Sequence, residues 1–362
     1  MTPDNITIEV ADFFSGCGGT SKGFENAGLT PVLAIDNDED SKKTFKRNFP
    51  QVKFLLRDIY KLKPKELANY LGKERESPIL FSGCAPCQPF TKQKTIHKEN
   101  DPKKGLLLEF LKFIEYYLPE YIFIENVPGI QKVDGKDGTF PKFIEEISKL
   151  GYFFKYKVIQ SQEFGVPQMR RRLILIGSLL GPIDFPPKTH GPGTTNPNYA
   201  TVRQFISEYP RIRAGETCLD VPNHRAAALS DTNLRRIRYL EEGQDRRSWP
   251  EDLVLECHKN DYSGHTDVYG RMWWDKPASG LTTRCISLSN GRFGHPDQDR
   301  AISVREAAAL QTFPNDFIFT GNLNSMARQI GNAVPVLLAE KFGENFIEHF
   351  SQITKEKNNA RV

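Results

Sequence analysis

The sequence lacks long apolar runs and is poor in cysteine, and each absence argues against a class of protein. No apolar stretch approaches the roughly 18 residues that a membrane-spanning helix needs. Residues 1–10 also lack the charged and then apolar build of a signal peptide. We therefore expect a cytoplasmic protein that has no membrane partner.

The six cysteines are spread along the chain, which argues against a disulfide framework in a protein without export signals. Cys84 and Cys87 form a C-x-x-C pair, but no second pair with zinc spacing follows them. No metal site is therefore predicted. A redox-active dithiol is the other interpretation of this pair.

The net charge of +4 is too small to identify a partner by itself. Between residues 188 and 300, however, nearly every cation is an arginine. Arginine makes bidentate contacts with phosphates and guanine edges, so this region is a candidate nucleic-acid surface. Acids are almost as numerous there, and a solvated surface of salt bridges is the alternative for most of these arginines.

Apolar stretches alternate with amphipathic ones from residue 6 to about 180. This alternation predicts an α/β fold with a mostly parallel sheet and helices on both faces. The predicted strands are Ile6–Phe14, Val32–Ile35, Val52–Leu56, Ile79–Ser82, Tyr121–Ile124, Phe153–Ile159 and Leu173–Ile176. Helical spacing predicts a helix over 106–118, stopped by Pro119, and a C-terminal helical region at Met326–Phe350.

A cluster of prolines and glycines at residues 181–193 predicts a linker. The stretch that follows, to about residue 318, is short in periodic segments. We therefore expect a larger domain formed by residues 1–185 plus 319–362, and a second, smaller and irregular domain formed by residues 186–318.

Polar and reactive residues follow the predicted strands. A glycine-rich turn at Phe14–Gly19 ends the first strand, and its N–H groups can hold a carboxylate or a phosphate. Asp36 ends the second strand, where a carboxylate can bind the ribose hydroxyls of NAD or of S-adenosylmethionine. Cys84, Cys87 and Glu125 follow two later strands, so we expect a thiol and an acid at one edge of the sheet.

Four sequence blocks resemble, in the same order, those of the DNA (cytosine-5) methyltransferase family. They are Pro86-Cys87-Gln88, Glu125-Asn126-Val127, Gln168-Met169-Arg170-Arg171-Arg172 and Gly331-Asn332-Ala333-Val334-Pro335. With the glycine-rich turn, they span nearly the whole chain. The resemblance implies a Rossmann-like, S-adenosylmethionine-dependent methyltransferase fold for the larger domain, which would be catalytic and cofactor-binding. It implies a target-recognition role for the smaller domain.

The resemblance assigns the chemistry to four residues. Carbon 5 of cytosine is a poor nucleophile, so a thiolate must first add to carbon 6, and Cys87 takes this role. Glu125 stabilises the charge that develops at ring nitrogen 3. Arg172, supported by Arg170, reaches the cytosine carbonyl oxygen. Alternation along a single strand predicts that these two arginines share one face.

The resemblance also implies S-adenosylmethionine as the cofactor and S-adenosylhomocysteine as the product. The expected cofactor-binding residues are Phe14, Ser15, Gly16, Cys17, Gly18, Gly19, Asp36, Asn37, Asp58, Ile59, Leu106, Asn332 and Ala333. Ser21 stands where the dinucleotide pattern has its third glycine, which favours this cofactor over NAD. The family usually has glutamate at the place of Asp36, so a shorter side chain makes the ribose contact here.

The implied partner is double-stranded DNA, from which the target cytosine must be flipped out. We expect DNA contacts from Gln88, just before the polar loop 91–100, and from Lys92 within it. Contacts are also expected from Arg271, Arg284 and Arg292. Flipping of a single cytosine predicts a monomer, and the resemblance implies an enzyme at the nucleoid of a prokaryote. Protection of host DNA in a restriction–modification system is the expected role, and the sequence leaves open whether a cognate endonuclease accompanies the enzyme.

Two alternatives belong to other classes. A tRNA cytosine-5 methyltransferase is suggested by Thr91, because the stretch Pro-Cys-Gln-Pro-Phe-Thr is frequent among tRNA-modifying relatives. The Cys-Phe-Thr tripeptide of those relatives is absent, and the arginine-rich region favours DNA. A non-catalytic DNA-binding relative would lack Cys87 or Glu125, and both are present.

Overall fold

The computed structural model describes residues 7–71, 77–85, 105–132, 135, 138–258 and 267–359. These residues form two compact units. Unit 1 takes the described residues of Met1–Gln160, Arg171–Pro187 and Leu338–Val362, and unit 2 takes those of Ser161–Arg170 and Lys188–Leu337. The chain passes from unit 1 to unit 2 after Pro187, which lies inside the predicted linker. Compactness assigns no function, so the division into a catalytic domain (1–185 plus 319–362) and a target-recognition domain (186–318) stays a prediction.

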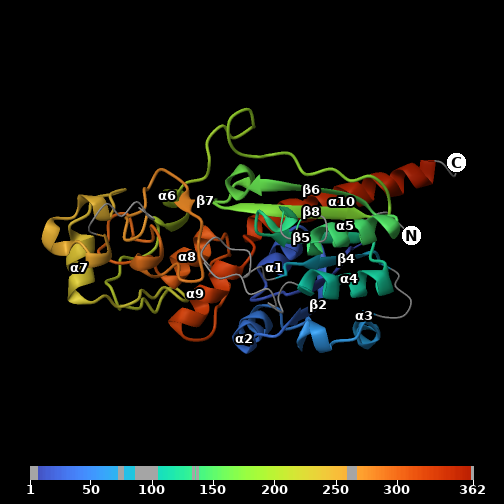
Figure 1. The fold of residues 1–362 in the computed structure, drawn as a ribbon, viewed down its shortest axis with the longest axis horizontal. Helices are drawn as coiled ribbons and strands as arrows, with labels where there is room; N and C mark the ends of the chain where they lie inside the picture. The colour runs from blue at the N-terminus through green and yellow to red at the C-terminus, as the bar shows by residue number, and fades with distance from the viewer. Residues whose placement is uncertain are drawn as a thin grey trace. The chain divides into compact units, whose positions relative to one another are not determined.

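Unit 1 contains a seven-stranded sheet with the order β3-β2-β1-β4-β5-β8-β6 (Figure 1). Its strands are β1 (Glu9–Phe13), β2 (Thr30–Asp36), β3 (Lys53–Leu56), β4 (Ile79–Gly83), β5 (Tyr121–Asn126), β6 (Phe153–Gln160) and β8 (Arg171–Ser178). Strands β1 to β5 pair in parallel, and β8 runs antiparallel to both of its neighbours. The predicted mostly parallel α/β sheet is confirmed.

The helices of unit 1 are α1 (Gly19–Asn26), α2 (Glu39–Asn48), α3 (Ala68–Leu71), α4 (Leu106–Tyr117), α5 (Thr139–Lys149) and, from Leu338 on, α10 (Val336–Asn359). Helix α4 ends as predicted, because Leu118 adopts a left-handed φ of 45° and Pro119 follows it. The single helical region predicted at 326–350 is wrong in one respect. Helix α9 (Leu323–Asn332) stops before Pro335, which lacks the N–H that a continuing helix would need.

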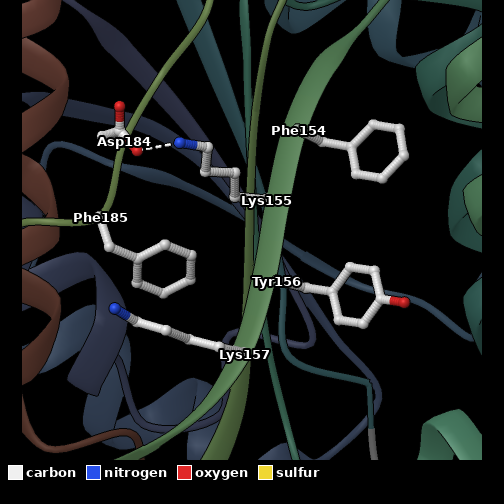
Figure 2. Close-up of a pocket in the computed structure, with 6 residues that line it drawn as sticks. All are labelled: Phe154, Lys155, Tyr156, Lys157, Asp184 and Phe185. Atoms are coloured by element: carbon white, nitrogen blue, oxygen red, sulfur yellow. Dashed lines mark hydrogen bonds and ion pairs between the residues drawn. The ribbon is translucent and has the colours of Figure 1, made fainter.

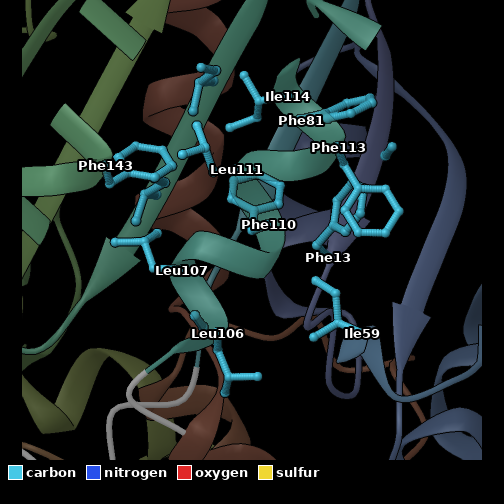
Figure 3. Close-up of a cluster of buried hydrophobic side chains, with 14 of the residues drawn as sticks. Phe13, Ile59, Phe81, Leu106, Leu107, Phe110, Leu111, Phe113, Ile114 and Phe143 are labelled. Atoms are coloured by element: carbon cyan, nitrogen blue, oxygen red, sulfur yellow. The ribbon is translucent and has the colours of Figure 1, made fainter. Parts of the chain in front are cut away.

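Both faces of the sheet are buried, as β5 shows. Ile122 and Ile124 join a core with Phe110 of α4, which lies among the side chains of Figure 3. On the other face, the ring centroid of Phe123 lies 5.5 Å from that of Phe342 in α10. Since successive side chains of a strand point to opposite faces, a fully buried strand needs cover on both sides.

Strand β6 forms one edge of the sheet, and its lysines point away from Phe154 and Tyr156 (Figure 2). Lys155 forms an ion pair with Asp184, and Lys157 lies 4.3 Å from the centroid of the Phe185 ring. These residues line a hollow of about 450 Å³. Charged side chains on an edge strand discourage pairing with another chain. None of the predicted site residues lines this hollow.

Unit 2 has few long elements, in agreement with the expected irregularity. It contains α6 (Val202–Ile206), α7 (Asp231–Arg238), α8 (Val304–Leu310), α9 and the short pair of strands β7 (Gln168–Met169) and β9 (Ala278–Ser279). Buried polar groups add to its small apolar cores. The Arg300 guanidinium donates to both Glu306 carboxylate oxygens at 2.7 Å, and both side chains are buried. Such a bidentate pair fixes the orientation of both side chains.

Candidate functional site

An acid and an arginine meet where β5 ends. Glu125 is buried, and its Oε1 lies 2.7 Å from Nε of Arg172, at the start of β8. The antiparallel register brings the two strands together, since Glu125 pairs with Ile174. Oε1 makes no hydrogen bond of good geometry with any described residue, so this contact is an ion pair with poor N–H alignment. The pair therefore leaves hydrogen-bonding capacity on a buried carboxylate.

The end of β4 lies beside this pair. Asn126 donates through Nδ2 to the carbonyl of Ala85 at 3.3 Å, which ties the ends of β4 and β5 together. Burial, with the charges of Glu125 and Asp12, raises the pKa of the Cys84 thiol well above its ordinary value. Cys84 is therefore held as a thiol and is a poor nucleophile. Cys87, Gln88, Lys92 and the loop 91–100 lie outside the described residues.

The glycine-rich turn is joined to the end of β2. The N–H of Gly16 donates to Oδ2 of Asp36 at 2.8 Å, and the N–H of Asp38 donates to Oδ1 at 2.9 Å. Gly16 has a φ of +53°, and apart from its chain neighbours no atom of the described residues lies within 4 Å of the position that a Cβ would take. The turn thus presents backbone to open space beside a carboxylate, which can accept further hydrogen bonds from ligand hydroxyls.

The other predicted cofactor residues of unit 1 belong to the turn itself or to segments that follow β2, β3 and β4 in the chain. Asp58 caps a short 3₁₀ helix, η2 (Ile59–Lys61), through a bond from the N–H of Tyr60. Ile59 and Leu106 are buried, and both lie at one end of the apolar cluster in Figure 3. The remaining residues of the turn are Phe14, half-buried with a φ of 59°, and Ser15, Cys17, Gly18 and Gly19, all buried. Asn37 is exposed.

Two further predicted cofactor residues, Asn332 and Ala333, belong to unit 2. The N–H of Ala333 donates to the carbonyls of Gln329 and Ile330 at the end of α9. Their contribution to the cofactor site stays a prediction.

The prediction that Arg170 and Arg172 share one face of a single strand is wrong. The strand is interrupted at Arg170, between β7 and β8. Arg170 is buried in unit 2, where its Nη1 donates to the carbonyls of Leu281 at 2.9 Å and Gly331 at 3.1 Å. It fixes the backbone of unit 2, whereas Arg172 pairs with Glu125 in unit 1. A supporting role for Arg170 must therefore act through the backbone that it holds.

Two of the three arginines predicted to contact DNA from unit 2 are buried. Arg271 is 4% exposed, and its guanidinium donates to the carbonyls of four residues and to Asp299. Arg292 is 3% exposed, donates to three carbonyls and pairs with Asp245 at 2.9 Å. These side chains hold unit 2 together, so their assignment as DNA contacts is corrected. Arg284 is exposed and keeps that assignment as a prediction.

Asp12 was absent from the predicted site. It sits in β1, is 0% exposed, and accepts a hydrogen bond from Oγ of Ser21 at 2.6 Å. Burial raises the pKa of this carboxyl to about 7, and the hydrogen bond from Ser21 offsets only part of the shift. The sequence did carry a signal for this residue, because Asp12 lies inside the apolar run Val10-Ala11-Asp12-Phe13. An acid is rarely fully buried unless it is paired, so an acid in a buried strand marks an unusual site.

We predict that Asp12→Asn stabilises the protein above neutral pH. The folded pKa of Asp12 lies above the ordinary value of 3.8, so the wild-type protein loses stability as the pH rises from about 4 to about 7. The loss amounts to a few kcal/mol, at roughly 1.4 kcal/mol per unit of pKa shift. Urea unfolding of both proteins at pH 4, 6 and 8 measures it. Equal pH dependence of the two proteins would contradict the burial of an ionisable Asp12.

Comparison with known proteins identifies the family of the chain. A sequence model of the family described as C-5 cytosine-specific DNA methylase matches residues 8–348. The chain is 39% identical to the Type II methylase M.HgiDII of Herpetosiphon aurantiacus over 98% of each chain. It is 33% identical to the Type II methyltransferase M1.HphI of Haemophilus parahaemolyticus, over 94% of this chain and 86% of that protein.

A solved structure shows the same fold. It is that of a putative DNA modification methyltransferase encoded within a prophage of E. coli, with a TM-score of 0.74 and 21% identity over 94% of this chain and 99% of that one. The family match covers most of the chain, from residue 8 to residue 348. The chain therefore belongs to the C-5 cytosine-specific DNA methylase family and is a DNA (cytosine-5-)-methyltransferase.

Proposed function

We propose that the enzyme transfers a methyl group from S-adenosylmethionine to carbon 5 of a flipped-out cytosine within a specific DNA sequence, through a covalent bond to Cys87. The observation that carries this proposal is the Glu125–Arg172 pair, 2.7 Å apart at the end of β5. An acid beside a guanidinium can meet two neighbouring polar atoms of a planar base. Glu125 would act at ring nitrogen 3, and Arg172 at the adjacent carbonyl oxygen.

The residues of unit 1 fit the cofactor. The hydroxyl of Ser15 is buried and has no hydrogen-bond partner among the described residues, and Gly16 leaves open space next to Asp36. S-adenosylmethionine supplies a methyl group on a positively charged sulfur. Asp36 would bind its ribose, Asp58 the amino group of its adenine, and Ile59 and Leu106 the faces of that ring.

We predict that Asp36→Ala weakens the binding of S-adenosylmethionine. Loss of the ribose contact is expected to cost about 1 to 3 kcal/mol, and loss of the bond to Gly16 also loosens the turn. Titration calorimetry measures the affinity. Glu39→Gln is the matched control, because Glu39 is an exposed acid only three residues away, in α2. Unchanged affinity in Asp36→Ala would remove this pocket from the proposal.

The nucleophile is proposed to be Cys87, which follows β4 in the sequence. The structure favours it indirectly, because the other thiol of the pair, Cys84, has a raised pKa and lies half-buried between acids. A cytosine within a duplex cannot reach a sheet edge, so the base must leave the stack. The lysines of loop 91–100 would grip phosphates as the substrate is captured.

We predict that replacing Arg284 changes DNA recognition, whereas replacing Arg271 lowers the stability of the protein. Arg284→Ala should weaken DNA binding or relax one position of the recognition sequence, without lowering the melting temperature. Arg271→Ala should destabilise the protein by about 3 kcal/mol or more, because it strands several buried carbonyls. Methylome sequencing and thermal melts measure the two effects. A stable Arg271→Ala with altered specificity would restore Arg271 as a DNA contact.

The biological role that we propose is protection of host DNA in a restriction–modification system, carried out by a monomer in the cytoplasm of a prokaryote. No described helix is long and apolar enough to cross a membrane. Bisulfite sequencing of DNA from cells that express the protein identifies the target sequence. Methylation of tRNA instead of DNA in the same cells would favour the tRNA-modifying alternative.

A further inference from the structure

A buried polar cluster lies beneath the first turn of α1. Asp12 of β1 and Ser82 of β4 are paired neighbours in the sheet, and both are 0% exposed. Ser21 of α1 donates to Oδ2 of Asp12 at 2.6 Å. Oδ1 of Asp12 and Oγ of Ser82 make no hydrogen bond of good geometry with any described residue. One oxygen of the carboxyl thus lacks a well-aligned donor among the described residues, which raises the free-energy cost of burying its charge.

The titratable groups near this carboxyl are acids and thiols. Asp12 makes no ion pair with any residue in the described part of the chain. Asp36 raises its pKa, and Asp12 and Glu125 both raise the pKa of Cys84. The Cys84 thiol in turn lies 3.7 Å from Oγ1 of Thr20 in α1. The carboxylates of this cluster, when ionised, place negative charge behind the turn that connects β1 to α1.

The same turn is the proposed binding site of the methyl donor. It begins two residues after Asp12, and the N–H of Gly16 fixes it to Asp36. A charge in a buried site acts on a nearby charged ligand more strongly than it would in water, because the effective dielectric constant of a protein interior is far below that of water. The methyl donor carries a sulfonium cation, whereas its demethylated product is a neutral thioether.

We propose that Asp12 is a specificity-determining residue, whose carboxylate favours the sulfonium of S-adenosylmethionine over the thioether of S-adenosylhomocysteine. This inference rests on the proposed function, because it takes the turn after β1 as the cofactor site. Discrimination against the product would help the enzyme to release it and to accept a new methyl donor. No direct contact with the ligand is needed, since the effect is electrostatic.

A linked proton follows from this assignment. Burial holds the pKa of Asp12 near 7, so a fraction of the molecules carries a proton there at neutral pH. A cation bound nearby favours the ionised form and expels that proton, and a neutral ligand does not. Burial also raises the pKa of Asp36 and of the Cys17 thiol. Cys17 and Cys84 stay protonated, so Asp36 is the competing source of the proton.

Titration calorimetry of the whole protein with each ligand tests the proposal. Binding is measured at pH 7 in phosphate and in Tris, whose ionisation enthalpies differ, so that the released protons can be counted. We expect proton release with S-adenosylmethionine and none with S-adenosylhomocysteine. In Asp12→Asn, we expect the release to disappear, and the affinity for S-adenosylmethionine to fall on the order of tenfold while that for the product changes less than twofold.

The control is Glu25→Gln, which removes one negative charge from α1, the helix that holds Ser21; Glu25 pairs there with Lys22 at 2.8 Å. It should leave both affinities and the proton release unchanged. Equal loss of both affinities in Asp12→Asn, or proton release that persists there, would overturn the proposal. If Asp12→Asn does not fold, equal release by the wild-type protein with the two ligands would overturn it. A wild-type protein that binds neither ligand would instead refute the proposed function.

Discussion

Replacing Cys87 with alanine is expected to abolish methyl transfer to DNA, whereas replacing Cys84 is expected to leave most of it. Carbon 5 of cytosine becomes reactive only after a nucleophile has added at carbon 6, so loss of that nucleophile should cost on the order of 10⁴-fold or more. Cys84 cannot substitute for it, because burial beside Asp12 and Glu125 keeps its thiol protonated. Transfer of labelled methyl groups to duplex DNA measures both rates.

The two cysteine variants serve as controls for each other, since both lose one thiol from the same C-x-x-C pair. Both should bind S-adenosylmethionine with wild-type affinity, which shows that the fold and the cofactor site persist. If Cys84→Ala were as inactive as Cys87→Ala at unchanged cofactor affinity, the assignment of the nucleophile would be wrong.

Replacing Glu125 with glutamine is expected to lower kcat by about 10²- to 10³-fold, with little change in cofactor affinity. Glutamine keeps the shape of the side chain but carries neither a negative charge nor an acidic proton. It therefore cannot balance the charge at ring nitrogen 3, and it leaves Arg172 without its ion-pair partner. Steady-state kinetics with saturating DNA separates this loss from a change in KM.

Glu109→Gln is a suitable control for this variant. Glu109 lies in α4, also in unit 1, and pairs with Lys112 at 2.7 Å on the surface of the helix. It should keep wild-type kcat. A Glu125→Gln variant whose kcat stays within threefold of wild type would argue that the acid has only a structural role at the end of β5.

Much of unit 1 could be predicted because its physics is local. Apolar runs such as Tyr121–Ile124 become buried parallel strands, and polar residues at their ends, such as Glu125, come together at one edge of the sheet. Asp36 ends β2 and meets the glycine-rich turn, as the pattern indicated. These features depend on residues that are close in sequence or on neighbouring strands.

The errors arose where distant parts of the chain decide the outcome. Arg271 and Arg292 are compatible with either a DNA surface or a buried network, and only the fold shows that backbone carbonyls take up their donors. Alternation at Arg170 failed because the strand breaks there and passes into unit 2. The charge on Asp12 could be seen in the sequence, but its partner Ser21 and its burial beneath α1 could not.

The most direct test of the proposed chemistry uses a duplex whose target cytosine carries fluorine at carbon 5. After the thiolate has added at carbon 6 and the methyl group has arrived at carbon 5, the proton on carbon 5 must leave before the Cys87 sulfur can be expelled. Fluorine cannot leave as a cation. The enzyme should therefore remain bound to DNA in a complex that resists denaturation.

We expect this complex to require S-adenosylmethionine, to be absent in Cys87→Ala and to form in Cys84→Ala. Fluorinated tRNA, run in parallel, should give no complex, and a complex with tRNA alone would favour the tRNA-modifying alternative. Absence of a complex on a duplex that the wild-type enzyme methylates in its unfluorinated form, or a complex that persists in Cys87→Ala, would contradict a covalent mechanism through Cys87.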